Sequence, residues 1–223
     1  MIVESMSYQE VIDEYKKDFP EMLSKIIALR NYNWDKEHRL MVKKKPKTPQ
    51  IFFSTNSKSK NNNNYILEAF TYSYAYWKKE GRLLNIVLDF QYQGGRNLLC
   101  NAYGDTSYYW IGSNFIQEYK DRFLHNDDSN AGITFLHRNP TAVDFNFVCG
   151  EYKGLSFNFL NDGIVLGHYV CPNVFYFGTF LNRDMLIGDE IELSNMLSKK
   201  YEAFLKDDCK INLSDIDIKN QQV

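Results

Sequence analysis

The 223-residue sequence lacks the patterns that mark a secreted or membrane-spanning protein. Its N-terminus, MIVESMSYQEV, has no basic segment followed by a long apolar run, so no signal peptide is expected. No stretch approaches the roughly 20 consecutive apolar residues that cross a bilayer. We therefore expect a cytoplasmic protein with no membrane partner.

Cysteine is scarce, and the common metal and nucleotide motifs are missing. No Cys-x-x-Cys occurs, and no histidine stands at ligand spacing from any of the four cysteines, Cys100, Cys149, Cys171 and Cys209. The glycines of YQGGRN are not followed by the Lys-Ser/Thr of a P-loop, and Gly-x-Ser-x-Gly and His-Glu-x-x-His are also absent. Reduced thiols are therefore expected, with no metal site and no cofactor.

Charge of one sign is also lacking, because the net charge is only −2. Bulk electrostatics therefore does not call for a nucleic-acid partner. The distribution is uneven, since residues 34–60 hold eight basic and two acidic residues. Lys43, Lys44 and Lys45, with Trp34 and Phe52 nearby, are candidates for contacting phosphate. A solvated basic loop is the favoured alternative.

Aromatic residues are abundant, and their pattern predicts an α+β fold. The 16 Phe and 16 Tyr residues favour a filled core with many strands. We expect N-terminal helices packed on a largely antiparallel sheet of hairpins, with one mid-chain helix and one C-terminal helix, in a single domain over 1–223. Its predicted parts are a helical segment (1–42), a basic, Asn-rich loop region (43–65), the sheet (66–186) with a helix at 113–124, a C-terminal helix (187–208) and a polar tail (209–223).

The N-terminal segment is predicted to hold two helices. Ser7 and Glu10 form a capping-box pair that begins a helix over 7–17. Asp18 then fits an N-cap and Pro20 a first helical turn, which predicts a second helix towards residue 38.

The middle and end of the chain read mainly as strands. Residues 65–77 and 82–92 are predicted to form a hairpin around KKEGR, with a helix as the alternative for 65–77. Ser113 or Asn114 is expected to cap the helix at 113–124, and a final helix is expected to begin near Asp189. Short strands are predicted at 97–103, 133–137, 143–148, 155–160, 163–170 and 174–180.

The Asp162-Gly163 pair predicts a two-residue type I′ turn between two of these strands. That turn would place His168 opposite Phe157, on an apolar face of the sheet. A structural histidine is the favoured interpretation there, and a catalytic or ligand-binding role is the alternative.

Polar residues on the helix at 113–124 form a second candidate group. Asn114, Glu118, Arg122 and His125 recur at steps of four and three and so share one face. A solvated face is the favoured interpretation. In the functional alternative, the face turns towards the sheet and Arg122 binds an anion.

His137 and Arg138 form a third candidate group, at the end of a predicted strand and before a proline turn. A histidine can exchange a proton near neutral pH, and an arginine can stabilise charge on a phosphate. Metal-independent RNA cleavage needs both. Thr179 is a candidate for adding a hydroxyl near the same sheet.

The segments SNFIQEYKDRFL, NDGIVLG and GTFLNRDML occur in an order that resembles uncharacterised bacterial proteins with a domain similar to RelE/barnase-like toxin ribonucleases. The resemblance covers about residues 108–190 and implies a small helix-plus-sheet domain with RNase activity. Such relatives often have a histidine at the head of the helix, where this chain has Asn114.

Two functions therefore remain open. The first is an RNase-like or nucleic-acid-associated protein, either toxin-like or a catalytically degenerate descendant, in which His137, Arg138, His168 and Arg122 are catalytic candidates. Its candidate substrate-binding residues are Asn114, Glu118, Thr179, Lys43, Lys44 and Lys45. The second is a non-catalytic module that binds another protein through its aromatic sheet and N-terminal helices. If the four catalytic candidates point into one cleft, the enzyme is favoured. The sequence leaves the oligomeric state open.

Overall fold

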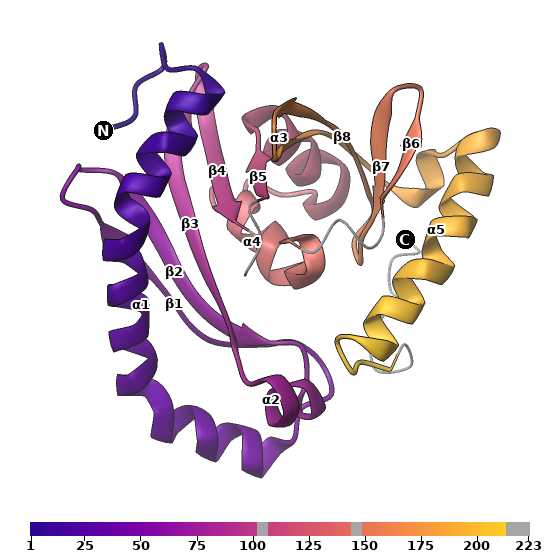
Figure 1. The fold of residues 1–223 in the computed structure, drawn as a ribbon. Helices are drawn as coiled ribbons and strands as arrows, with labels where there is room; N and C mark the ends of the chain where they lie inside the picture. The colour runs from indigo at the N-terminus through magenta and orange to yellow at the C-terminus, as the bar shows by residue number, and fades with distance from the viewer. Residues whose placement is uncertain (102–106, 144–148, 213–223) are drawn as a thin grey trace.

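A computed structural model describes residues 1–101, 107–143 and 149–212, apart from the side chains of residues 143 and 149. One nine-stranded sheet runs through these residues in the order β1-β2-β3-β4-β5-β9-β8-β7-β6 (Figure 1). Neighbouring strands pair antiparallel except for β5 and β9, which are parallel. The α+β fold with a mainly antiparallel sheet is confirmed. The strands are β1 (Gln50–Lys58), β2 (Asn64–Thr71), β3 (Leu83–Tyr92), β4 (Gly95–Asn101), β5 (Tyr108–Ile111), β6 (Cys149–Tyr152), β7 (Leu155–Phe159), β8 (Ile164–Cys171) and β9 (Val174–Leu181).

Helices cover both faces of this sheet. The helical elements are α1 (Tyr8–Lys44), α2 (Tyr74–Glu80), α3 (Ser113–Tyr119), the π-helix η1 (Lys120–Leu124), α4 (Ala131–Arg138), the 3₁₀-helices η2 (Pro140–Val143) and η4 (Arg183–Met185), and α5 (Asp189–Asp207). Side chains alternate along β3, so Ile86 and Leu88 pack under α1 while Val87 joins the cluster under α3 and α4. The two sides are called here the α1 face and the α4 face.

The N-terminal segment is one helix, so the predicted break at residues 18–20 is wrong. The Ser7–Glu10 capping box begins α1 as expected, and Pro20 lies inside the helix. Asp18 does not cap a new helix, because its buried carboxylate accepts hydrogen bonds from Asn61, Asn63 and Tyr65 beside the β1–β2 turn. Burial of the α1 stripe on the sheet outweighs the backbone hydrogen bond that proline removes.

Asp18 makes the stability of the folded protein depend on pH in the acidic range. Burial alone would raise the pKa of this carboxyl, but hydrogen bonds from Asn63, Ser59, Asn61 and Tyr65 outweigh burial and lower it. A lowered pKa in the folded state means that the carboxylate contributes stability above its ordinary value of 3.8, and this contribution is lost as the pH falls through the folded pKa.

We therefore expect the free energy of unfolding to fall below about pH 4 more steeply in the wild type than in Asp18→Asn. Urea denaturation followed by circular dichroism between pH 3 and 7 measures this difference. Asp121→Asn, an exposed control, should leave the slope unchanged. Equal slopes for the wild type and Asp18→Asn would contradict the role of this carboxylate.

The predicted basic loop at 43–65 and the simple hairpin after it are both wrong in part. The loop region contains the edge strand β1, whose polar residues pair with β2. Residues 64–71 form the strand β2, but α2 occupies residues 74–80, so both alternatives for residues 65–77 occur in succession. Ser73 ends the strand pattern because its hydroxyl accepts the Tyr76 amide and caps α2.

The predicted strand at 133–137 is instead α4. Its buried residues Ala131, Gly132, Phe135 and Leu136 recur at helical spacing, so the helix buries them together against the sheet. The predicted strand at 143–148 lies mostly outside the described residues, as does part of the one at 97–103, whose residues 97–101 belong to β4. The strands at 155–160, 163–170 and 174–180 match β7, β8 and β9, and the helix at 113–124 matches α3 with η1. Gly112, rather than Ser113 or Asn114, is its N-cap.

The predicted type I′ turn is wrong, and with it the pairing of His168. Phe159 pairs with Ile164, so four residues connect β7 to β8, and neither Asp162 nor Gly163 has a positive φ. The shift of two residues places Leu166, not His168, opposite Phe157. His168 pairs with Tyr176 on β9 and is exposed.

The C-terminal helix is confirmed as α5, but the predicted polar tail does not begin at residue 209. Cys209 and Ile211 are buried. They belong to a core cluster, distinct from those under α1 and α4, that packs α5 against β7. Residues 213–223 lie outside the described part of the chain. Within the described residues, no helix has the length and apolar character that a membrane span requires.

Candidate functional site

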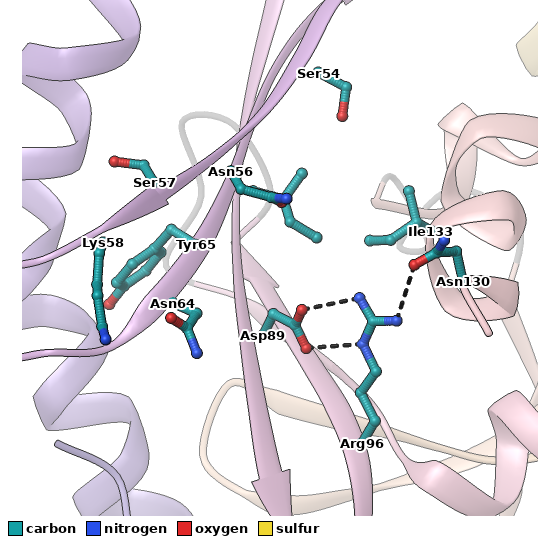
Figure 2. Close-up of a pocket in the computed structure, with 11 residues that line it drawn as sticks. Ser54, Asn56, Ser57, Lys58, Asn64, Tyr65, Asp89, Arg96, Asn130 and Ile133 are labelled. Carbon is teal, nitrogen blue, oxygen red and sulfur yellow. Dashed lines mark hydrogen bonds and ion pairs between the residues drawn. The ribbon is translucent and has the colours of Figure 1, made fainter.

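A polar groove of about 490 Å³ lies on the α4 face, where β1, β2 and β3 extend beyond the helices that cover the rest of the sheet (Figure 2). Its floor follows from strand register, because Lys58 pairs with Asn64, Asn56 with Ile66 and Ser54 with Glu68. Pairs two residues apart project to one face. The groove is lined by Ser54, Asn56, Ser57, Lys58, Asn64, Tyr65, Ile66, Asp89, Arg96, Asn130 and Ile133.

One wall of the groove is an ion pair tied to the start of α4. The Arg96 guanidinium donates through Nε and Nη2 to both Asp89 oxygens, each at 2.9 Å. Its Nη1 donates to the Ser129 carbonyl and to Asn130 Oδ1, as Figure 2 shows for Asn130. Because Arg96 is neutralised and held on three sides, Lys58 is the unpaired cation among the groove's described lining residues.

A partly buried Glu68–His137 pair lies beside the groove residue Ser54. His137 Nε2 lies 2.6 Å from Glu68 Oε1; the Glu68 side chain is 5% exposed and that of His137 30%. Ser54, at the groove floor, donates to Glu68 Oε1 at 2.7 Å. A cavity of about 20 Å³, room for about one water molecule, adjoins the pair and is lined by Pro49, Ile51, Glu68, Phe70, Asn85, Leu136, His137 and Pro140.

Helix geometry explains why His137 reaches this position. Ile133 and His137 are one turn apart on α4, so the residue that lines the groove and the residue that contacts Glu68 share one side of the helix. Glu68 stands on β2 between Leu67 and Ala69, which face α1, so its carboxylate points to the α4 face. The pair therefore joins helix and sheet at the end of the groove.

The neighbouring residue Arg138 turns away from the groove. Its guanidinium donates through Nε and Nη2 to the two oxygens of the buried Asp162 and lies 5.0 Å from the centre of the Phe123 ring. The hydrogen bonds with Asp162 raise the pKa of Arg138. Arg138 thus fixes α4 to the β7–β8 connection and is not free to hold a substrate phosphate.

The other predicted site residues do not gather with His137. Arg122 donates to the Phe180 carbonyl and pairs with Glu118 at 3.3 Å, while Glu118 accepts the Phe180 amide. This pair docks α3 and η1 onto β9. Asn114 is exposed on α3, Thr179 lies half-buried on β9, His168 is exposed on β8, and Lys43, Lys44 and Lys45 are exposed at the end of α1.

The four catalytic candidates therefore do not point into one cleft, and of them only His137 lies near the groove, where its partner Glu68 accepts a hydrogen bond from the groove residue Ser54. Glu68, Ser54 and the Asp89–Arg96 pair were not predicted from the sequence. One signal was present, because Glu68 is the only charged residue in the apolar segment YILEAFT. A carboxylate inside a strand that is otherwise buried requires a polar partner.

The chain was compared with known families, curated proteins and solved structures. Nothing matches. The resemblance to RelE/barnase-like ribonucleases thus stays a prediction, and a function is inferred from the groove and the Glu68–His137 pair. Among the described residues, no group of three or more His, Cys, Asp or Glu side chains is arranged to hold a metal ion.

Proposed function

We propose that the groove binds RNA and that His137, held by Glu68, transfers the proton during cleavage of the strand. The observation that carries this proposal is the 2.6 Å contact between His137 and Glu68 at the end of a polar groove. A carboxylate that accepts a hydrogen bond from one imidazole nitrogen orients the ring and leaves the other nitrogen for a substrate.

The chemistry requires only the ribose and one phosphate of the substrate. His137 takes the proton of the 2′-hydroxyl, and the 2′ oxygen forms a bond to phosphorus while the bond from phosphorus to the 5′ oxygen breaks. The 5′ oxygen takes a proton from water, and the imidazolium returns its own proton to the hydroxide that remains. The products are a cyclic phosphate and a 5′-hydroxyl end.

The groove lining suits a single strand of RNA better than a duplex. Amide and hydroxyl groups such as Asn56, Asn64 and Ser54 offer donors and acceptors at one surface, and Lys58 supplies a positive charge for a phosphate. Unpaired bases and 2′-hydroxyls are read by such groups. We therefore expect the strand to pass along β1 and β2 towards His137.

The alternative from the sequence, a protein-binding module that uses its aromatic sheet, has less support. The large rings of the sheet, including Trp110, Tyr65 and Phe177, are almost fully buried beneath the helices. The inner side of α1 is equally occupied, since Val11, Ile12 and Met22 are buried against the sheet. Neither surface is presented to a partner.

Cleavage of a fluorescent single-stranded RNA by the purified protein tests the proposal. His137→Ala should lower the rate at least ~100-fold while the dissociation constant for RNA changes little, because the general base is removed and the groove is kept. Glu68→Gln, which preserves size and some hydrogen bonding, should lower the rate less, by ~10-fold.

His125→Asn is the matched control, because it removes an exposed histidine and asparagine tolerates the left-handed backbone there. It should cleave at the wild-type rate. Equal loss in His168→Ala would move the site to β8. Wild-type protein that does not cleave RNA would overturn the proposal.

A further inference from the structure

A row of four rings crosses the corner where the end of α1 meets α2. Trp34 and His38 are one turn apart on α1, with centroids 6.1 Å apart. The His38 ring lies 5.7 Å from Trp77 on α2, and Trp77 stacks on Tyr74 at 6.0 Å with an interplanar angle of 27°. Trp34, His38, Trp77 and Tyr74 are called here the ring row.

A buried ion pair holds the ring row in place. Trp77 Nε1 donates to Glu37 at 3.1 Å, Glu37 pairs with Arg82 at 2.7 Å, and the Arg82 guanidinium lies 4.4 Å from the centre of the Trp34 ring. Burial raises the pKa of Glu37 and lowers that of Arg82. Because the rings are fixed before any ligand arrives, binding would order few side chains.

The ring row is open to solvent. Trp34 is 49% exposed, His38 is exposed, and Trp77 and Tyr74 are half-buried. The indole of Trp34 is capped on one side by Arg82, so it contributes little to the core clusters of the sheet. Accessible rings such as Trp34 and the stacked Trp77–Tyr74 pair resemble the stacking platforms that bind unpaired bases.

Positive charge concentrates around the same corner. Residues 30–47 and 74–82 contain ten basic and three acidic residues in a chain whose net charge is −2. Two of the acids are already paired, Glu37 with Arg82 and Glu80 with Lys79. The Tyr74 amide donates to the Pro46 carbonyl at 2.7 Å, which brings the lysines at the end of α1 beside α2.

These lysines are free to contact a polyanion. Lys43, Lys44 and Lys45 are exposed and, among the described residues, make no ion pair. Lys78, in the last turn of α2, is likewise exposed and makes no ion pair with a described residue. The negative end of the α1 dipole favours cations at Lys43, Lys44 and Lys45. These lysines give a cationic surface next to the ring row.

We propose that the ring row and the adjacent lysines bind a single-stranded segment of RNA, with bases stacked on the rings and phosphates on the lysines. This surface is separate from the groove, so the proposal does not require cleavage. An anionic membrane would also attract the lysines, but an interfacial helix needs a broad apolar face. Here the rings form a single narrow row.

Fluorescence anisotropy of a labelled 12-nucleotide oligouridine with the full chain tests this proposal. Trp34→Leu should weaken binding ~10-fold at every salt concentration because one stack is lost. Lys43→Gln, Lys44→Gln and Lys45→Gln combined should weaken binding and reduce the slope of log affinity against log salt by about 2, since each phosphate contact on a single strand contributes about 0.7.

Matched controls separate this surface from non-specific charge. Lys199→Gln, Lys200→Gln and Lys206→Gln combined remove three exposed lysines of α5, and Tyr32→Leu removes an exposed ring outside the row; both should leave the affinity unchanged. Circular dichroism confirms that each variant is folded.

Three results would overturn the proposal. They are unchanged affinity in Trp34→Leu, an equal loss in the α5 triple variant, and binding to vesicles containing phosphatidylserine without binding to RNA. If only the groove proposal is wrong, the wild-type protein will not cleave RNA, but its affinity for oligouridine will still depend on Trp34 and the three lysines.

Discussion

Asp162→Ala is expected to lower the free energy of unfolding by about 3 kcal/mol, because it removes the acceptor shared by three donors in a buried place. Asp162 is 4% exposed. Its carboxylate accepts hydrogen bonds from Tyr119 at 2.6 Å, from Arg138 at 2.9 and 3.0 Å, and from Asn139 at 2.9 Å. Burial raises the pKa of Tyr119, so its hydroxyl stays protonated and needs this acceptor.

The loss comes mainly from the groups left behind. Tyr119 and Asn139 are fully buried and would keep unpaired polar atoms, whereas the Arg138 side chain is 47% exposed and can turn to water. Asp127→Ala is the control, since its side chain is fully exposed beside Lys120, and it should change stability by less than about 0.5 kcal/mol. Urea denaturation measures both, and a similar small loss in Asp162→Ala would contradict this account.

Trp110→Ala should cost about 4 kcal/mol, close to the upper range for a core substitution. Trp110 is 0% exposed on β5, and its ring packs edge-on against Tyr8, Phe90 and Tyr92 with centroids 4.7, 5.0 and 5.1 Å away. Truncation would open a large cavity between α1 and the sheet.

The loss of a buried hydrogen bond adds to the energetic cost of this cavity. Trp110 Nε1 donates to Asn97 Oδ1 at 2.9 Å, and Asn97 is 3% exposed. Trp110→Ala would leave that oxygen unpaired. Tyr32→Ala, at a residue 88% exposed, is the aromatic control and should lie within about 0.5 kcal/mol of the wild type. Thermal and urea denaturation would decide, and equal stabilities for the two variants would refute the packing argument.

The sequence predicted those helices and strands whose caps and apolar periodicity lie within the element itself. The Ser7–Glu10 capping box begins α1, the apolar stripe Phe115–Tyr119 lies in α3, and three aromatic strand segments match β7, β8 and β9. These elements were predicted correctly because local sequence preference and tertiary packing favour the same secondary structure there. The same reasoning failed at Pro20, where the wide contact of α1 with the sheet keeps the helix intact.

The candidate site was predicted only in part. His137 was a candidate for proton transfer, but its partner Glu68 lies 69 residues earlier in the chain. Its predicted companions Arg138 and Arg122 bind Asp162 and Phe180 instead. Which polar residues meet depends on strand register and on the side of α4 that faces the sheet, and neither can be read from spacing along the sequence.

The sequence by itself determined the α+β class, the positions of most strands and the helices at both ends, because periodicity and caps act over a few residues. The tertiary structure decided that residues 131–138 are a helix, that Asp162 is a buried acceptor rather than a turn residue, and that β1 to β3 leave a polar groove. The physical reason is that burial and hydrogen-bond partners are supplied by residues distant in the chain.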